Sequence, residues 1–191
     1  MPTIGSRRSR RLSGDAILKQ HVSFYERMHV MDFGAGTGLI SAAIAPLVGK
    51  ITALDTSGAM LEKLVAKPAL RGKVKTVCRD ITDTPLGIRF DGIVSAMAMY
   101  HVQDTHRLIR VFAEHAKPGA VIALADLDKE DGSFHPEGTQ GVFHHGFDRA
   151  EFGAMLEEHG FGGCSFHHRA FHPPGGERVS GIFVCRHKEL N

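Results

Sequence analysis

The feature of this sequence that most constrains its fold is a regular alternation of short apolar runs with amphipathic stretches, which begins at residue 29. Apolar and β-branched runs predict strands at 29–33, 51–55, 74–78, 92–96 and 121–125. The stretches at 39–47, 57–65 and 104–116 carry apolar residues at helical spacing and predict helices. Strands that alternate with helices form βαβ units, so we expect an α/β fold with a mainly parallel sheet.

The C-terminal part of the chain predicts one more helix and two more strands. Asp148 followed by Glu151 forms a capping box, and Phe147 with Phe152 can close a hydrophobic staple, so a helix is expected to begin there and to end at Gly160. Strands are expected near 164–168 and 181–186. Residues 127–147 show little apolar periodicity and exceed the usual loop length. They are expected to be disordered or to form a lid over a substrate.

Length and cysteine content limit the class of protein. A chain of 191 residues without a linker-like segment predicts one domain. Its three cysteines, Cys78, Cys164 and Cys185, are an odd number without a Cys-x-x-Cys pair, which argues against a secreted disulfide framework and a zinc ribbon. No apolar run is long enough to span a bilayer. A soluble, cytoplasmic protein is therefore expected.

Positive charge is concentrated near the N-terminus. The arginines at 7, 8, 10 and 11 outweigh the net charge of +2 of the whole chain, so the remaining residues are net negative. Because the rest of the chain is net negative, it is not expected to form a nucleic-acid-binding surface. The arginine cluster itself has three interpretations: a contact with RNA or phosphate, an organellar transit segment, or a solvated helix face.

Carboxylates follow four of the five predicted strands. Asp32, Asp55, Asp80 and Asp126 stand at or just after the ends of the first, second, third and fifth strands. Ligands of open parallel sheets bind beyond the carboxyl ends of the strands. A pocket with this lining suits a ligand that carries hydroxyl groups and positive charge, and it suits a pyrophosphate poorly.

The glycine segment after the first strand supports the same conclusion. Gly34, Gly36 and Gly38 have the spacing G-x-G-x-G, whereas a dinucleotide-binding fingerprint would need its third glycine at Leu39. Glycines at this turn let the backbone approach a ligand closely. Asp55, at the end of the second strand, can accept hydrogen bonds from both hydroxyls of a ribose.

These segments resemble a known family, the class I S-adenosylmethionine-dependent methyltransferases. Residues 30–38 and 53–57 resemble its first two motifs, and the resemblance continues through 78–81, 90–95, 117–119 and 160–161. Within this superfamily, the chain is most similar to the small-molecule branch that includes the ubiquinone and menaquinone biosynthesis methyltransferases. The resemblance implies a Rossmann-like, doubly wound seven-stranded sheet, mostly parallel with an antiparallel last strand. It also implies a methyltransferase domain at 28–191 that follows a basic segment or helical cap at 1–27.

The resemblance also implies a role for individual residues. Asp32 would face the ammonium group of S-adenosylmethionine, Asp55 its ribose and Asp80 its adenine amino group. The turn would admit the methionine moiety, and Ile81 would pack against the adenine ring. Thr56 and Met60 would flank the adenosine. The full set of expected cofactor-binding residues is Asp32, Gly34, Ala35, Gly36, Thr37, Gly38, Asp55, Thr56, Met60, Asp80, Ile81 and Ala96.

Methyl transfer from a sulfonium needs positioning and exclusion of water, and it needs a base only when the acceptor arrives protonated. His101 is the candidate base, because the superfamily often places a residue near the methyl group at this point. The candidate substrate contacts are Tyr100, Asp126, His144 and His145. The histidines at 135, 144, 145, 167, 168 and 172 have no spacing of the H-E-x-x-H kind, so no metal is predicted.

The predicted function is methyl transfer from S-adenosylmethionine to an oxygen or carbon of a small-molecule acceptor. Strand four ends in Ser95-Ala96-Met97-Ala98 and lacks an Asn-Pro-Pro-type segment, which makes DNA bases and protein amides less favoured acceptors. Two alternatives stay open: a catalytically silent, cofactor-binding domain with a regulatory role, and an NAD-dependent oxidoreductase of Rossmann type. The sequence does not specify the acceptor or the oligomeric state.

Overall fold

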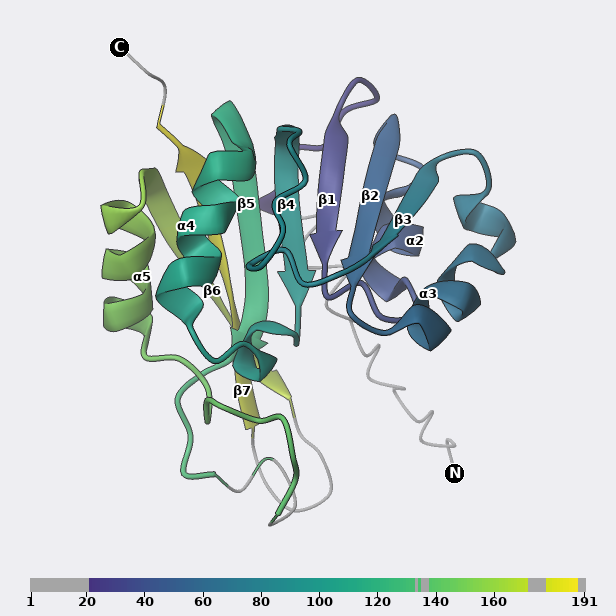
Figure 1. Cartoon of the computed structure of the whole chain (residues 1–191). Helices are drawn as coiled ribbons and strands as arrows, with labels where there is room; N and C mark the ends of the chain where they lie inside the picture. Colours follow the sequence, from purple (N-terminus) through teal and green to yellow (C-terminus); the bar gives the residue numbers. More distant parts are fainter. Residues whose placement is uncertain (1–20, 133, 135–137, 172–177, 189–191) are drawn as a thin grey trace, which may run out of the picture.

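The computed structural model describes residues 21–132, 134, 138–171 and 178–188, and its core is a seven-stranded sheet (Figure 1). The strand order is β3-β2-β1-β4-β5-β7-β6. The strands are β1 (His29–Phe33), β2 (Lys50–Asp55), β3 (Val74–Cys78), β4 (Phe90–Ala96), β5 (Ala116–Leu127), β6 (Phe161–Phe171) and β7 (Arg178–His187). β7 runs antiparallel to both of its neighbours, and β1 to β5 are parallel. The predicted fold class and antiparallel last strand are confirmed.

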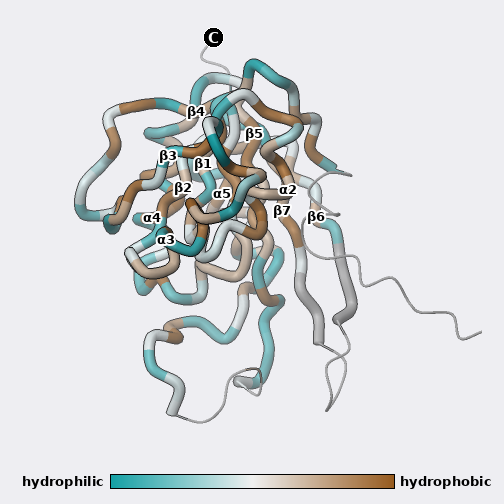
Figure 2. Tube along the Cα trace, turned by 90° about the vertical axis from the view of Figure 1, so that its right-hand side faces the viewer, coloured by the Kyte–Doolittle hydropathy of each residue, from teal (hydrophilic) through white to brown (hydrophobic). Residues whose placement is uncertain are grey.

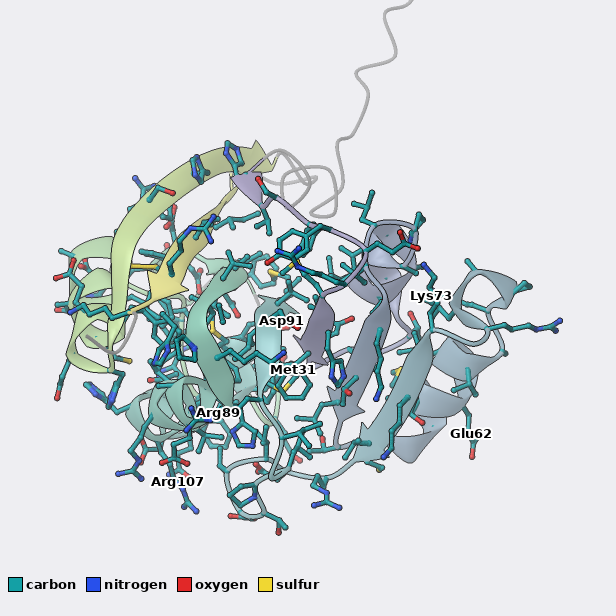
Figure 3. All side chains as sticks on the ribbon, turned by 90° about the horizontal axis from the view of Figure 1, so that it is seen from above. Met31, Glu62, Lys73, Arg89, Asp91 and Arg107 are labelled. Carbon is teal, nitrogen blue, oxygen red and sulfur yellow. A yellow bond between two sulfur atoms is a disulfide. The ribbon has the colours of Figure 1, made fainter. Side chains whose placement is uncertain are left out.

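Two helical layers cover the sheet, one on each face (Figure 1). One layer contains α2 (Leu39–Ile44) and α3 (Gly58–Val65), and the other contains α4 (Thr105–His115) and α5 (Arg149–Glu158). Short 3-10 helices lie at Pro68–Leu70 (η1) and Met99–His101 (η2). Each layer has its own apolar core, because each helix turns one stripe of apolar residues to the sheet. Figure 3 shows Met31 of β1 in the centre of the molecule and Glu62 on the outside of α3.

The expected N-cap, aromatic pair and C-terminal glycine of α5 are confirmed. The Asp148 carboxylate accepts hydrogen bonds from the backbone N–H groups of Ala150 and Glu151, and the rings of Phe147 and Phe152 lie 5.0 Å apart. Gly160 follows the helix with a φ of 86°, a left-handed conformation that favours glycine. Residue 148 therefore determines where the helix begins, and the aromatic pair directs the preceding chain onto the sheet.

The long segment between β5 and α5, residues 128–147, is called the lid loop below. Its described residues lie beyond the carboxyl ends of the parallel strands, and Figure 2 shows that they are mostly hydrophilic. The loop is tied to the sheet at its base, where Phe147 donates a backbone hydrogen bond to the carbonyl of Leu127 and Lys129 donates one to Phe147. The predicted helical cap falls largely on residues 1–20, which lie outside the described residues.

Cys164 of β6 and Cys185 of β7 form a disulfide bond, and Cys78 has a free thiol. The odd cysteine count argued against a disulfide framework and did not anticipate this single bond. The reason is that the two sulfur atoms meet only through the pairing of β6 with β7, a contact that residue spacing does not reveal. Among the described residues, no helix is long and apolar enough to cross a membrane.

Candidate functional site

A pocket of about 780 Å³ lies at the carboxyl ends of β1, β2, β3 and β4. The order β3-β2-β1-β4 places a topological switch between β1 and β4, which is where open α/β sheets bind ligands. Loops after four strands, the first turn of α4 and one residue of the lid loop line this pocket. The lining residues are Phe33, Gly34, Gly36, Leu54, Asp55, Thr56, Ser57, Met60, Arg79, Asp80, Thr82, Met97, Ala98, His101, Val102, Gln103, Asp104, Arg107 and Phe143.

Asp55 is held in a fixed orientation at the end of β2. Its Oδ2 accepts a hydrogen bond of 2.7 Å from the N–H of Gly36, and its Oδ1 accepts one of 2.8 Å from the N–H of Ser57. Each carboxylate oxygen has capacity for a second hydrogen bond. The oriented carboxylate can therefore accept one hydroxyl at each oxygen, which is the pattern that a ribose presents.

The three glycines of the β1–α2 turn all have left-handed φ values, but they differ in their surroundings. A β-carbon at Gly34 would collide with that of Ala98, and one at Gly38 would lie 2.5 Å from Cγ of Leu64. A β-carbon at Gly36 would meet nothing within 4 Å. Gly36 therefore leaves open space in the pocket, whereas the other two glycines allow close packing of the protein itself.

Asp32, in β1, is 1% exposed and lies behind this turn. Its Oδ2 accepts hydrogen bonds from the N–H and the hydroxyl of Ser41, at 3.0 and 2.6 Å. Its Oδ1 is buried and has no hydrogen-bond partner among the described residues. Burial raises the pKa of this carboxyl to about 6, because desolvation disfavours the charged form. An unpaired buried oxygen of this kind fits an ammonium group or a water molecule that bridges to one.

These observations test whether S-adenosylmethionine, the cofactor that the resemblance implies, fits the site. Asp55 supplies acceptors for two hydroxyls next to the open space at Gly36, and Asp32, buried behind the turn, supplies an unsatisfied acceptor. Met60 and Phe33 add apolar surface to the same pocket. The donor set and the open turn match a nucleoside that carries positive charge, so the residues present fit the cofactor.

Asp80 also lines the pocket, and its Oδ1 accepts hydrogen bonds from the N–H and hydroxyl of Thr82. The structure places the remaining expected cofactor contacts in two groups. Gly34, Thr56 and Met60 line the pocket with Gly36, Asp55 and Asp80. The others do not line it: Asp32, Ala35 and Ile81 are buried, Ala96 packs against the core under α2 and α3, and Thr37 and Gly38 continue the turn into α2.

His101 ends η2 and lines the pocket. Its Nδ1 lies 2.6 Å from the carbonyl oxygen of Gly141 in the lid loop. A carbonyl only accepts hydrogen bonds, so Nδ1 carries the proton in this contact. In the neutral imidazole, Nε2 is then left as a proton acceptor. The lid loop thereby selects the tautomer in which His101 can act as a base.

The lid loop makes further contacts with the same segment, among them a backbone hydrogen bond of 3.4 Å from the N–H of His144 to the carbonyl of Tyr100. Phe143 donates its backbone N–H to the carbonyl of Tyr100 at 2.9 Å, and the His144 ring donates from Nε2 to the carbonyl of Val102 at 2.9 Å. Phe143 reaches the pocket with its side chain, but His144 does not. His145 lies near Glu130, with 3.7 Å between Nδ1 and Oε1, and does not line the pocket.

Asp126 has a structural role that differs from the predicted contact with substrate. It is 4% exposed, and its Oδ2 and Oδ1 accept hydrogen bonds from the backbone N–H groups of Met99 and Leu127, both at 2.9 Å. Burial raises the pKa of this carboxyl to about 6. Tyr100 is also buried and does not line the pocket. None of the four residues proposed as substrate contacts lines the pocket. Asp126 and His144 hold the segment 99–102, to which Tyr100 belongs, whereas His145 lies apart from it beside Glu130.

Several lining residues were not predicted from the sequence. Arg79, Thr82, Gln103, Asp104, Arg107 and Phe143 belong to loops after β3 and β4, to α4 and to the lid loop. The sequence signal that could have identified them is that these loops lie at the same edge of the sheet as the predicted pocket. Met97, just after β4, has a φ of 55°, which is uncommon for a residue other than glycine and is often found at functional sites. The strained backbone turns the chain from β4 into η2.

Residues 30–119 match the family model described as a methyltransferase domain. An uncharacterised methyltransferase of Schizosaccharomyces pombe is 29% identical over 153 residues, which cover 71% of this chain and 54% of that protein. The ubiquinone biosynthesis O-methyltransferase of Xanthomonas campestris is 31% identical over 110 residues, covering 55% of this chain and 45% of that protein. The chain thus spans about half the length of the curated relatives it matches.

Solved structures share the fold. Phosphoethanolamine N-methyltransferase 2 of Haemonchus contortus, in complex with phosphomonomethylethanolamine and S-adenosylhomocysteine, superposes with a TM-score of 0.76. The match covers 92% of this chain and 52% of that chain at 15% sequence identity. At this identity the likeness concerns the fold, and the pocket must be interpreted from the residues of this chain.

Proposed function

We propose that this chain acts as a class I S-adenosylmethionine-dependent methyltransferase, which binds this cofactor in the 780 Å³ pocket and transfers its methyl group to a small-molecule acceptor. The observation that carries the proposal is the carboxylate of Asp55, which two backbone N–H groups orient beside the open space at Gly36. In this proposal Asp55 binds the ribose, Asp32 faces the ammonium group and Asp80 lies on the adenine side.

The bound cofactor would supply a methyl group on a sulfonium, which needs no further activation. The contribution of the protein is then to orient the acceptor, to exclude water and to remove a proton. Nε2 of His101 would accept the proton of an acceptor hydroxyl, because the bond from Nδ1 to Gly141 leaves Nε2 as the acceptor nitrogen. The lid loop would cover the acceptor while it holds His101 in place.

The proposed acceptor is a small molecule with a hydroxyl or an acidic carbon, such as a phenol. Phe143, Val102 and Met97 offer apolar surface next to His101 in the same pocket. The name of the Xanthomonas campestris relative, an O-methyltransferase of ubiquinone biosynthesis, supports transfer to an oxygen of an aromatic ring. Action in the cytoplasm on such a small acceptor stays part of the proposal.

The test is a screen of phenolic acceptors for release of S-adenosylhomocysteine, followed by the same assay on His101→Gln. We expect kcat to fall at least about 100-fold with a phenol, while the affinity for S-adenosylmethionine changes less than about twofold. At a pH at which the acceptor is already ionised, the loss should shrink, since no proton remains to be removed. His145→Gln is the matched control, because His145 lies outside the pocket.

An unchanged kcat in His101→Gln would exclude His101 as the base. Cofactor binding without turnover of any acceptor would favour the silent, regulatory domain. The two results are distinct, because the first concerns one residue and the second concerns the reaction.

A further inference from the structure

A group of potential metal ligands lies outside the cofactor pocket, between the two helices that cover one face of the sheet. Nitrogen atoms of His106 and His159 and a carboxylate oxygen of Glu158 all lie within 4.8 Å of one another. His106 belongs to the first turn of α4, Glu158 is the last residue of α5, and His159 caps that helix. We propose that these three residues form a binding site for Zn²⁺.

An unpaired nitrogen of His159 supports this proposal independently of the distances between the three ligand atoms. Its Nε2 is buried and has no hydrogen-bond partner among the described residues. Buried polar atoms are nearly always paired, so this nitrogen calls for a partner. The ring of His106 lies 5.9 Å from that of His159, centroid to centroid, at an angle of 71°. Two imidazoles at this separation can bind one ion between them.

The donor set selects the kind of ion. Two imidazole nitrogens and one carboxylate are ligands that suit zinc, whereas calcium and magnesium prefer oxygen ligands alone. Zinc binds these ligands at about 2.0–2.2 Å and would leave a fourth position for water. His106 and Glu158 are exposed and can change rotamer to close on the ion, while the half-buried His159 is the fixed ligand.

The site would join two elements that are neighbours in Figure 1 but distant in the sequence. Asp104 and Arg107, on either side of His106, line the cofactor pocket. A zinc ion at His106 would therefore hold the wall of the pocket formed by α4 against α5. Its main effect would be on stability, because none of its three ligands lines the pocket.

The experiment is a titration of the metal-free whole chain with Zn²⁺, by calorimetry and by thermal unfolding. We expect one ion per chain, and at zinc concentrations near 100 times Kd a rise in Tm of about 5–10 °C. His106→Ala and Glu158→Gln should each weaken zinc binding at least about tenfold and lose this rise. Glu157→Gln, a change of the preceding exposed carboxylate, is the matched control and should bind like the wild type.

Co²⁺ provides a second measurement, since its visible absorption reports whether the ion has tetrahedral nitrogen and oxygen ligands. Circular dichroism of the metal-free variants checks their folding, which we expect to be intact because both substituted side chains are exposed. Absence of zinc binding would overturn the proposal. Binding of equal affinity in wild type, His106→Ala and Glu158→Gln would overturn it too, since the ion would then occupy another site. Neither result depends on the activity of the protein toward an acceptor.

Discussion

At the residue scale, the glycine turn after β1 shows how one sequence motif can contain two different requirements. Gly34 and Gly38 need both a left-handed backbone and the absence of a β-carbon, because Ala98 and Leu64 occupy the neighbouring space. Gly36 needs the left-handed backbone, but its surroundings are empty. Gly34 and Gly38 therefore serve the packing of the fold, whereas Gly36 leaves open space in the pocket, where we propose that the cofactor binds.

This difference predicts that two similar substitutions have different main effects, one on stability and the other on cofactor binding. Gly38→Ala should lower the free energy of unfolding by about 2–4 kcal/mol, because a left-handed alanine is strained and its β-carbon overlaps Leu64. Gly36→Ala should cost only about 1–2 kcal/mol, from backbone strain alone, but it should reduce cofactor binding at least about tenfold. Urea unfolding and calorimetry measure the two effects. Equal losses of stability in both variants would contradict this assignment.

Asp126 predicts a specific pH dependence of stability. Its pKa in the native state is raised to about 6 from an ordinary value of 3.8. Between pH 4 and 6 the unfolded chain has lost a proton that the native chain still holds, so this carboxyl lowers the free energy of unfolding as pH rises. Asp126→Asn removes that dependence. When the pH is raised from 4 to 7.5, the free energy of unfolding of the variant should rise by about 1–3 kcal/mol relative to that of wild type.

The measurement is urea unfolding of both proteins at the two pH values. Asp32 has a pKa shifted in the same direction, but it is present in both proteins and cancels in the difference. A difference in stability between variant and wild type that does not change with pH would show that Asp126 titrates normally.

The sequence predicted the pocket residues whose position follows from a strand end, such as Asp55 and Asp80, because backbone direction alone places them. It could not predict which way Asp126 and His144 turn. Their side chains are oriented by backbone groups of η2 and of the residues next to it, and this short 3-10 helix has no periodicity that a sequence pattern reveals. Side-chain direction was therefore the weakest part of the prediction.

At the element scale, η2 and the lid loop form one unit. The lid loop donates a backbone hydrogen bond to Tyr100 and a ring hydrogen bond to Val102, and it accepts one from His101. Asp126 caps the other side of η2. Movement of the lid loop would therefore be transmitted to His101, the proposed base.

The disulfide between β6 and β7 predicts a simple chemical result. The denatured, unreduced chain should show one reactive thiol, that of Cys78, out of three cysteines. Reduction should lower the free energy of unfolding by about 2–4 kcal/mol, because the closed loop restricts the unfolded chain. The double variant Cys164→Ser/Cys185→Ser should be insensitive to reductant. Three reactive thiols before reduction would contradict the pairing.

The strands and the α-helices were predictable because apolar periodicity and caps determine them. Asp104 begins α4 as N-cap, and its Oδ1 accepts the N–H of Arg107 at 2.8 Å, as helix-start chemistry requires. The lengths of the strands were less predictable. β5 extends over twelve residues because β4 and β7 both pair with it. Strand length thus depends on neighbouring strands that are distant in the sequence.

At the scale of the whole molecule, charge distribution is more informative than total charge. Four basic residues lie near the N-terminus, outside the described part of the chain, whereas carboxylates gather at one edge of the sheet. Arg79 and Arg107 also line the pocket, but Nη2 of Arg107 donates to the carbonyl of Thr82 at 2.6 Å. Figure 3 places Arg107 and Glu62 at opposite sides of the molecule. Three carboxylates, those of Asp55, Asp80 and Asp104, and two guanidinium groups line the pocket, so its lining carries one net negative charge.

The most direct test of this account is calorimetric titration of the whole chain with S-adenosylmethionine. Wild type should bind one molecule per chain. Asp55→Ala should bind at least about 100-fold more weakly, a loss of about 2.7 kcal/mol of binding free energy. The reason is that this variant lacks the carboxylate proposed to accept the ribose hydroxyls. Glu62→Ala, which removes an exposed carboxylate of α3 outside the pocket, should bind like wild type. No heat of binding to wild type, or equal affinity in Asp55→Ala, would contradict the account.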